Sequence, residues 1–239
     1  MKQIIDFLGW LQARHRHEAI YRGHANGAWH LTPSAFRVGE YGITTRQHLA
    51  DWRHAAARTL DSRPQSDFEW LVLAQHYGIA TGLLDWTTNP LVAFFFACSE
   101  PYDQDGCVIQ FARENFQEFK KPESITVFSG TREKPALLDA SAMNARTKAQ
   151  DSVMSLHYGA FPTMSLAPNG EVYGVPAATK ALGLIALSRL GISSDRMFPD
   201  LTVAAQRFKS GLTIAASFSQ STTSPKFSQR DRNKDTNTS

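Results

Sequence analysis

The sequence offers little material for a disulfide framework or a membrane span. Of its 239 residues only Cys98 and Cys107 are cysteine, which is too few for the disulfide network of a small secreted domain. The longest uninterrupted apolar run, Leu91 to Cys98, has eight residues, whereas a transmembrane helix needs about 20. The first residues carry an amide, Gln3, and an acid, Asp6, too early for a secretory signal. We therefore expect a cytoplasmic protein that does not contact a membrane.

The common catalytic and metal-binding motifs are also missing. The sequence has no phosphate-binding loop, no glycine-rich dinucleotide turn, no His-Glu-x-x-His and no serine-elbow pentapeptide. Four histidines lie close together near the N-terminus, but no carboxylate or thiol accompanies them at a metal-ligand spacing; they are His15, His17, His24 and His30. The sequence therefore predicts no metal site.

Lysine and acidic residues are scarce in one region that is rich in arginine. Residues 13 to 58 contain seven arginines, no lysine and three acids, although the net charge of the whole chain is only +3. Guanidinium groups suit the planar, bidentate recognition of phosphate or carboxylate. For Arg46, Arg53 and Arg58 a second interpretation is at least as good, because all three fall on one predicted amphipathic helix and its solvated face accounts for them.

What the chain does contain is the composition of a folded domain. Hydrophobic residues make up 42% and charged residues 20% of the sequence, enough to bury one substantial core. Periodicity and turn signals predict the following elements: helices over 3–14, 45–60, 67–77, 91–98, 180–190 and 198–209, and strands over 19–23, 81–87, 106–111 and 124–128. Residues 136–150 are predicted to form a helix, or a helix and the start of a strand. Short strands mixed irregularly with helices favour a single α+β domain over residues 1–218. Residues 219–239 are polar and aperiodic, which predicts a disordered tail.

The first of two unusual stretches is Tyr21-Arg22-Gly23. Here an arginine ends a hydrophobic strand, and the glycine after it allows a backbone or a ligand to approach closely. One interpretation is that Arg22 projects into a cleft and holds a phosphate or carboxylate group. The other is that it forms a structural ion pair with an acid such as Asp85.

The second stretch runs from Gln75 to Thr87. Asp85 follows two leucines in an apparently buried strand, so it is predicted to be buried and paired, either with Arg22 or with amides at the start of the next helix. In one interpretation Asp85 and Thr87 cap that helix and Trp86 belongs to the core. In the other, the three residues line a nucleotide-binding cleft.

Together these stretches resemble the FRG domain family, which is named for a Phe-Arg-Gly motif. The matching segments are Tyr21-Arg22-Gly23, Trp29 to Ser34 with Arg37, the central block Gln75 to Ala97, and Gly191-Ile192 with Phe198 to Leu201. They occur in the family's order and extend over residues 1 to about 210. The sequence departs from the family pattern at a few positions, where it has His24, Gly82, Ser152 and Met154.

The resemblance implies a distant relationship to ADP-ribosyltransferases, with a split-sheet α+β core surrounded by helices. In such proteins a first-strand arginine grips the phosphates or ribose of NAD, which here implies Arg22. A following strand shapes the nicotinamide pocket, and a later polar residue orients the ribose. The residues implied for binding NAD as substrate are Arg22, Gly23, His76, Tyr77, Thr81, Asp85, Trp86 and Thr87. Gln150, in the stretch Arg146 to Gln150, is implied for the later catalytic role, with Glu171 as the reserve.

The function implied by this resemblance is an NAD-dependent ADP-ribosyltransferase that acts as a bacterial or phage-defence toxin. Its acceptor is then a protein, an RNA or a DNA, and its partner an antitoxin or immunity protein. The alternative is a module that binds a nucleotide or a partner in the same cleft without turnover, which the absence of an obvious Glu-x-Glu pair favours.

Overall fold

The computed structural model describes residues 2–14, 18–60, 62–128, 134–157, 170–200, 205 and 208. The chain divides into two compact units, Met1–Pro199 and Asp200–Ser239. In the second unit only Asp200, Ala205 and Phe208 are described, and the last two are helical. The predicted tail at 219–239 and the predicted domain end at 218 therefore lie outside the described residues.

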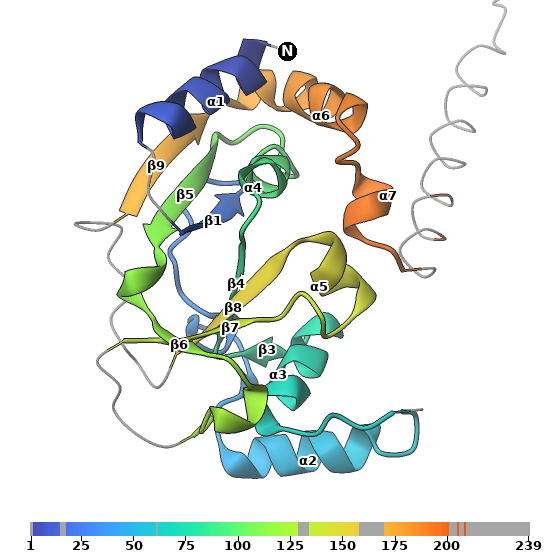
Figure 1. Cartoon of the computed structure of the whole chain (residues 1–239). Helices are drawn as coiled ribbons and strands as arrows, with labels where there is room; N and C mark the ends of the chain where they lie inside the picture. Colours follow the sequence, from blue (N-terminus) through green and yellow to red (C-terminus); the bar gives the residue numbers. More distant parts are fainter. Residues whose placement is uncertain are drawn as a thin grey trace, which may run out of the picture. The chain divides into compact units, whose positions relative to one another are not determined.

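The first unit is a mixed α/β structure built on a mostly antiparallel sheet (Figure 1). In the described residues this sheet has the strand order β6-β7-β8-β4-β1-β5-β9. Its strands are β1 (Ala19–His24), β4 (Leu83–Thr87), β5 (Gly106–Ala112), β6 (Gln117–Phe119), β7 (Ala136–Asp139), β8 (Ser152–Leu156) and β9 (Gly170–Val175). Only the pairing of β6 with β7 is parallel, and a small separate sheet pairs β2 (Gly42–Ile43) with β3 (Ala80–Thr81). The predicted mixture of helices and short strands is confirmed.

The large sheet opens between two of its central strands. β1 is registered against β4 at a single position, Tyr21 opposite Thr87. By contrast, β1 pairs with β5 along its whole length, and β4 pairs likewise with β8. One half of the sheet therefore consists of β1, β5 and β9, and the other begins with β4. This opening leaves backbone groups of both strands available to side chains.

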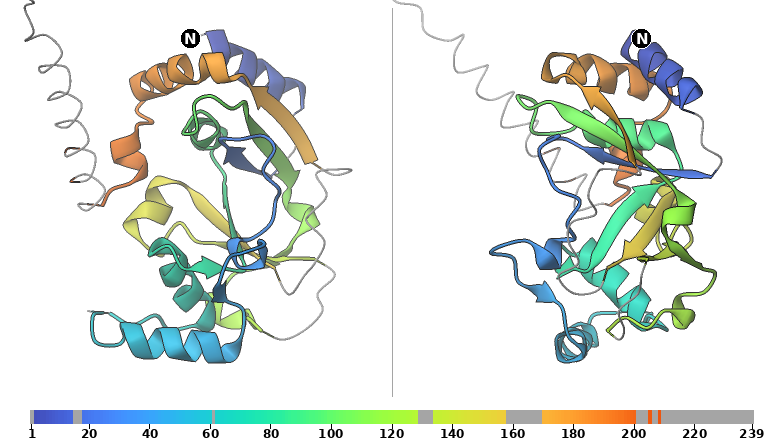
Figure 2. Two further views of the ribbon diagram at one scale, coloured as in Figure 1. Left: turned by 180° about the vertical axis from the view of Figure 1, so that it is seen from behind. Right: turned by 90° about the vertical axis from the view of Figure 1, so that its left-hand side faces the viewer.

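Helices cover the two halves separately, as the views in Figures 1 and 2 show. The longer helices are α1 (Lys2–Ala13), α2 (Arg46–Ala56), α3 (Asp67–His76), α4 (Pro90–Ala97) and α6 (Lys180–Arg189), and the shorter ones are α5 (Ala145–Ala149) and α7 (Ser194–Met197). α4 lies beside β1 and β5, with α1 and α6 packed around it, and α3 and α2 lie below β4.

Glycine allows α4 to sit directly against the sheet. A Cβ atom added to Gly23 would lie 2.0 Å from the carbonyl oxygen of Ala93, and one added to Gly106 would lie 2.2 Å from that of Ala97. No side chain fits at either position. The close approach foreseen for Gly23 is thus made by the backbone of α4.

The capping signals of the sequence are confirmed in detail. The side chain of Ser66 accepts from the backbone N–H of Glu69, and Glu69 completes the capping box of α3. Asn89 caps α4 in front of Pro90. Gly78 adopts the left-handed conformation that ends α3, with φ of 83°. Local hydrogen bonding determines these boundaries, which is why a short sequence window predicts them.

Two predicted elements are wrong. The strand predicted over 124–128 is replaced by a 3-10 turn, Pro122–Ser124, and irregular chain. Ile125 and Val127 supply the apolar signal by packing into the core from this loop. Residues 136–150, predicted as a helix or as a helix and the start of a strand, form strand β7 followed by the short helix α5. The continuous helix is wrong because Ala136–Asp139 pairs with β8. In the described part of the chain no helix has the length and apolar character needed to cross a membrane.

Candidate functional site

A pocket lies at the opening of the sheet, between β1 and β4. It encloses about 490 Å³, including space open to solvent. Its lining residues are Tyr21, Arg22, Gly23, Asp85, Trp86, Thr87, Phe96, Arg146, Gln150 and Ser152. An adjoining pocket of about 340 Å³ shares Asp85, Arg146 and Gln150 with it. The two hollows therefore border the same three polar side chains.

Arg22 occupies the opening between the two strands. Its Nε donates to Nε2 of His24 at 3.0 Å, and its Nη1 donates to the backbone carbonyl of Asp85. Burial lowers the pKa of the Arg22 guanidinium, and the nearby Asp85 carboxylate acts in the opposite direction. The group remains a cation, because no protein environment deprotonates an arginine. A positive charge therefore faces the pocket.

Asp85 corrects the sequence prediction of a buried ion pair. Its side chain is exposed and accepts from Nε2 of Gln75 at 2.8 and 2.7 Å. Arg22 contacts the backbone of this residue and not its carboxylate. Alternation along β4 does not explain the error, because Leu83 lies on the same face as Asp85 and is buried. Asp85 is exposed because it lies beside the opening, where β1 no longer pairs with β4. A carboxylate with remaining acceptor capacity is thus presented to the pocket.

A chain of hydrogen bonds holds Asp85 in place. Oε1 of Gln75 accepts from the Thr81 hydroxyl at 2.6 Å, and the backbone N–H of Thr81 donates to the Ser34 hydroxyl at 3.1 Å. Thr81 is fully buried. Thr81 therefore supports the site from behind and does not line it.

The opposite wall comes from α5 and the residue that follows it. Gln150 is buried, and its Nε2 donates to the carbonyl of Met197 at 2.9 Å. The guanidinium of Arg146 lies 5.0 Å from the centre of the Phe198 ring and lines both pockets. The pocket consequently has a guanidinium on each of two walls, Arg22 and Arg146, with Asp85 as its carboxylate among the lining residues.

Two buried histidines lie behind Arg22. Burial and the neighbouring Arg22 charge lower the pKa of His24 to about 3, and the same two causes lower the pKa of His157 to about 4. Nε2 of His157 is hydrogen-bonded to the Ser155 hydroxyl at 2.8 Å. Both imidazoles are therefore neutral at physiological pH.

Trp86 and Thr87 line the pocket, but their polar atoms form hydrogen bonds within the protein. The Trp86 indole N–H donates to the Ser155 hydroxyl at 2.8 Å, and its ring packs edge-on against Phe111 and Phe116. The Thr87 hydroxyl accepts from the backbone N–H of Asn89 at 3.0 Å. The first interpretation is confirmed for Trp86 as a core residue and for Thr87 as a partner of the helix start, but not for Asp85, whose carboxylate bonds Gln75. That Asp85, Trp86 and Thr87 bind a nucleotide stays a prediction.

The other predicted site residues are distributed more widely. His76 lines the adjoining pocket, whereas Tyr77 is 65% exposed and lines neither. Glu171 is not brought to the pocket: it lies on β9, two strands from β1, with a carboxylate oxygen 3.1 Å from Nε of Arg14. Of the two candidates for the later catalytic role, only Gln150 reaches the site.

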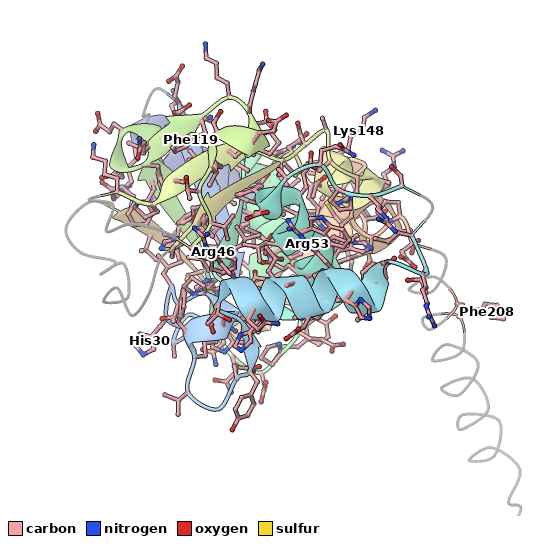
Figure 3. All side chains as sticks on the ribbon, turned by 90° about the horizontal axis from the view of Figure 1, so that it is seen from below. His30, Arg46, Arg53, Phe119, Lys148 and Phe208 are labelled. Atoms are coloured by element: carbon pink, nitrogen blue, oxygen red, sulfur yellow. The ribbon has the colours of Figure 1, made fainter. Side chains whose placement is uncertain are left out.

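The remaining arginines of the rich region are dispersed. Figure 3 shows Arg46 and Arg53 along α2. Neither is among the lining residues of the two pockets. Arg53 forms an ion pair with Asp67 and lies over the ring of Trp70 at 5.6 Å. The alternative of a solvated helix face holds for the exposed Arg46, whereas Arg58 is exposed in the turn after α2, which ends at Ala56.

The sequence analysis does not identify two residues that form the site, Arg146 and Gln75. Arg146 was overlooked although it begins the stretch that contains Gln150, and Gln75 was overlooked although it opens the central block. A polar residue at a helix end facing a strand acid is the signal that points to Gln75. Within the described ranges no three His, Cys, Asp or Glu side chains gather as metal ligands; His15 and His17 lie outside them.

Comparison with known proteins identifies one family. The model of the FRG domain matches residues 17–106, a segment that contains Arg22, Gln75 and Asp85 but ends before Arg146 and Gln150. No curated protein and no solved structure matches the chain. The matched segment begins just before β1 and ends at the first residue of β5, so it covers the strand opening that forms the pocket. On this match, residues 17–106 are similar to the FRG domain, the family that the order of the motifs implied.

Proposed function

We propose that this protein binds NAD in the pocket at the sheet opening and transfers its ADP-ribose group to an acceptor. The observation that carries the proposal is the pair of guanidinium groups, Arg22 and Arg146, that line one pocket together with a single carboxylate, Asp85. Two fixed cations suit a diphosphate, which presents two negative charges and several acceptor oxygens. The split of the sheet beside β1 is consistent with the ADP-ribosyltransferase-like core that the family resemblance implies.

The reaction needs little covalent chemistry from the protein. The bond between C1′ of the ribose and the nicotinamide nitrogen breaks, its electron pair leaves with nicotinamide, and an oxocarbenium-like ribose remains. A nucleophile of the acceptor then forms the new bond to C1′ and loses a proton. Positioning and electrostatic stabilisation account for most of the rate in such a step.

The residues of the pocket fit these tasks by their charge. Arg22 and Arg146 hold the diphosphate, and Asp85 accepts hydrogen bonds from ribose hydroxyls while its charge stabilises the cationic transition state. Gln75 keeps the carboxylate oriented through its amide. Gln150 borders both hollows and is suited to contact the ribose or the incoming acceptor.

A binding module without turnover is the second candidate. It is favoured by the amide of Gln150, which already donates to Met197, and by the position of Glu171 away from the pocket. In this case the same cations hold a nucleotide or a phosphorylated partner, and no bond is broken.

Release of free nicotinamide from NAD separates the two candidates. The full-length protein is incubated with NAD, with and without cell lysate, and nicotinamide is measured by chromatography; calorimetric titration with ADP-ribose is run in parallel. A transferase releases nicotinamide and Arg22→Lys abolishes the release, whereas the exposed control Arg189→Lys does not. Binding of ADP-ribose without any release supports the binding module, and no binding contradicts both.

The biological setting follows from the family resemblance and is proposed with it. A toxin of bacterial or phage defence, active in the cytoplasm and held by an antitoxin or immunity protein, consumes NAD or modifies a protein, RNA or DNA. Induced expression is then expected to arrest bacterial growth, and Arg22→Lys is expected to relieve the arrest. Growth unaffected by the wild-type chain would contradict the toxin assignment.

A further inference from the structure

His24 lies two residues after Arg22 on the same strand, so both side chains project from the same face of the sheet. The imidazole is buried, with 3% of its surface exposed. Its Nε2 accepts the Arg22 Nε–H at 3.0 Å. It is not among the residues that line the pocket, so it reaches the pocket only through Arg22.

The guanidinium of Arg22 is held at two of its three nitrogens. Nε donates to His24, and Nη1 donates to the backbone carbonyl of Asp85. In the described part of the chain Nη2 has no partner. Two anchors define the plane of a guanidinium, so the remaining N–H groups have one fixed direction. A free arginine side chain would lose rotamer entropy when a ligand ordered it, and an arginine that is already anchored loses less.

The hydrogen bond requires a neutral imidazole, because a doubly protonated ring has no acceptor. The low pKa of His24, about 3, keeps the ring neutral over the whole physiological range. Burial and the Arg22 charge lower this pKa. Arg22 therefore helps to keep His24 in the neutral form whose Nε2 accepts the Arg22 Nε–H and orients the guanidinium.

We propose that His24 is a positioning residue that holds Arg22 in the orientation in which its unpartnered Nη2 receives a phosphate group. The inference rests on the proposed function, since it requires a phosphate-bearing ligand in the pocket. It assigns to His24 a role through Arg22 and no contact with the ligand itself.

The test compares an apolar with a polar replacement. Binding of inorganic pyrophosphate and of ADP-ribose is measured by calorimetry for wild type, His24→Leu and His24→Gln, with thermal unfolding of each. His24→Leu removes the acceptor and is expected to weaken both ligands about tenfold. His24→Gln, whose amide oxygen accepts from Nε, is expected to restore affinity to within about threefold of wild type. His157→Gln is the matched control, because His157 is a second buried neutral imidazole that bonds Ser155 and not Arg22; its affinities are expected to stay unchanged.

A double-mutant cycle with Arg22→Lys shows whether His24 acts through the arginine. If it does, His24→Leu causes little further loss of affinity once Arg22 is lysine, whereas independent effects multiply. Should His24→Leu not fold, His24→Asn replaces it: its shorter amide does not reach Nε, so weakened binding supports the proposal. Wild-type affinity in folded His24→Leu or His24→Asn overturns the role of His24, and so do independent effects in the cycle. Either result leaves the proposed function in place. If wild type binds neither ligand, the proposed function falls as well.

Discussion

Arg22 and Asp85 are joined through the backbone and not as an ion pair. Nη1 of the arginine donates to the main-chain carbonyl of Asp85, and the Asp85 carboxylate is instead held by Gln75. This contact spans the place where β1 and β4 stop pairing. It keeps a cation and an anion adjacent without neutralising them, so each remains available to a ligand.

Arg22→Lys is expected to weaken pyrophosphate and ADP-ribose binding about tenfold or more, with only a small loss of stability. Lysine keeps the charge but lacks the planar fork that reaches His24 and the Asp85 carbonyl together. Calorimetric titration with thermal unfolding of the same samples checks this. An unchanged affinity for both ligands would remove the main ground for the proposed function.

Asp85→Asn is expected to change the free energy of unfolding by less than about 1 kcal/mol, because the side chain is exposed. It is expected to abolish nicotinamide release, since the neutral amide does not stabilise a cationic ribose. Urea denaturation and the nicotinamide assay measure the two effects. A fully active asparagine variant would show that the carboxylate is incidental.

Gly23→Ala is expected to destabilise the fold by about 3 kcal/mol, because the new methyl group meets the carbonyl of Ala93 at 2.0 Å. Gly174→Ala is the matched control: it lies on strand β9, and nothing described lies within 4 Å of its added Cβ. Urea denaturation of both variants measures the difference. Equal stabilities would contradict the tight seating of α4 on β1.

Lys180→Met is expected to cost about 3 kcal/mol. The buried ammonium donates to the carbonyls of Ala25, Ser99 and Pro101 at 2.5, 3.3 and 2.6 Å, and methionine leaves these acceptors unsatisfied in the interior. The exposed Lys120→Met serves as control. Chemical denaturation is the measurement, and a wild-type midpoint for Lys180→Met would show that these three hydrogen bonds contribute little to stability.

Stability is expected to fall on acidification below about pH 6.5. His24 and His157 stay neutral in the folded state down to pKa values of about 3 and about 4, whereas their ordinary pKa is 6.5. In this window the unfolded chain binds more protons, so the free energy of unfolding decreases by about 1.4 kcal/mol per pH unit for each histidine. Above about pH 7 both histidines are neutral in the folded and in the unfolded chain, so they no longer change the free energy of unfolding as the pH rises.

Urea denaturation from pH 4.5 to 8 measures this slope. His157→Gln removes one of the two titrating groups. The slope of this variant is therefore expected to be smaller than that of wild type by about 1.4 kcal/mol per pH unit. A slope identical to wild type would show that His157 titrates normally in the folded protein.

The helix boundaries and the family resemblance follow from short stretches of the sequence. Helix caps such as Ser66 and Asn89, the glycine stop at Gly78 and the apolar helix α4 depend on hydrogen bonds and burial within a few residues of each other, so a short window predicts them. The order of its motifs pointed to the FRG domain, which the family match confirms.

The tertiary structure alone decided which polar side chains share a pocket. Two leucines before Asp85 predict burial, but Asp85 is exposed because the sheet opens beside it, where β1 no longer pairs with β4. Arg146 and Gln150 meet Arg22 only because the sheet opens between β1 and β4, and Glu171 is excluded because β9 pairs on the far side of β5. Strand order and register depend on pairings between distant segments, and these follow from the packing of the whole unit.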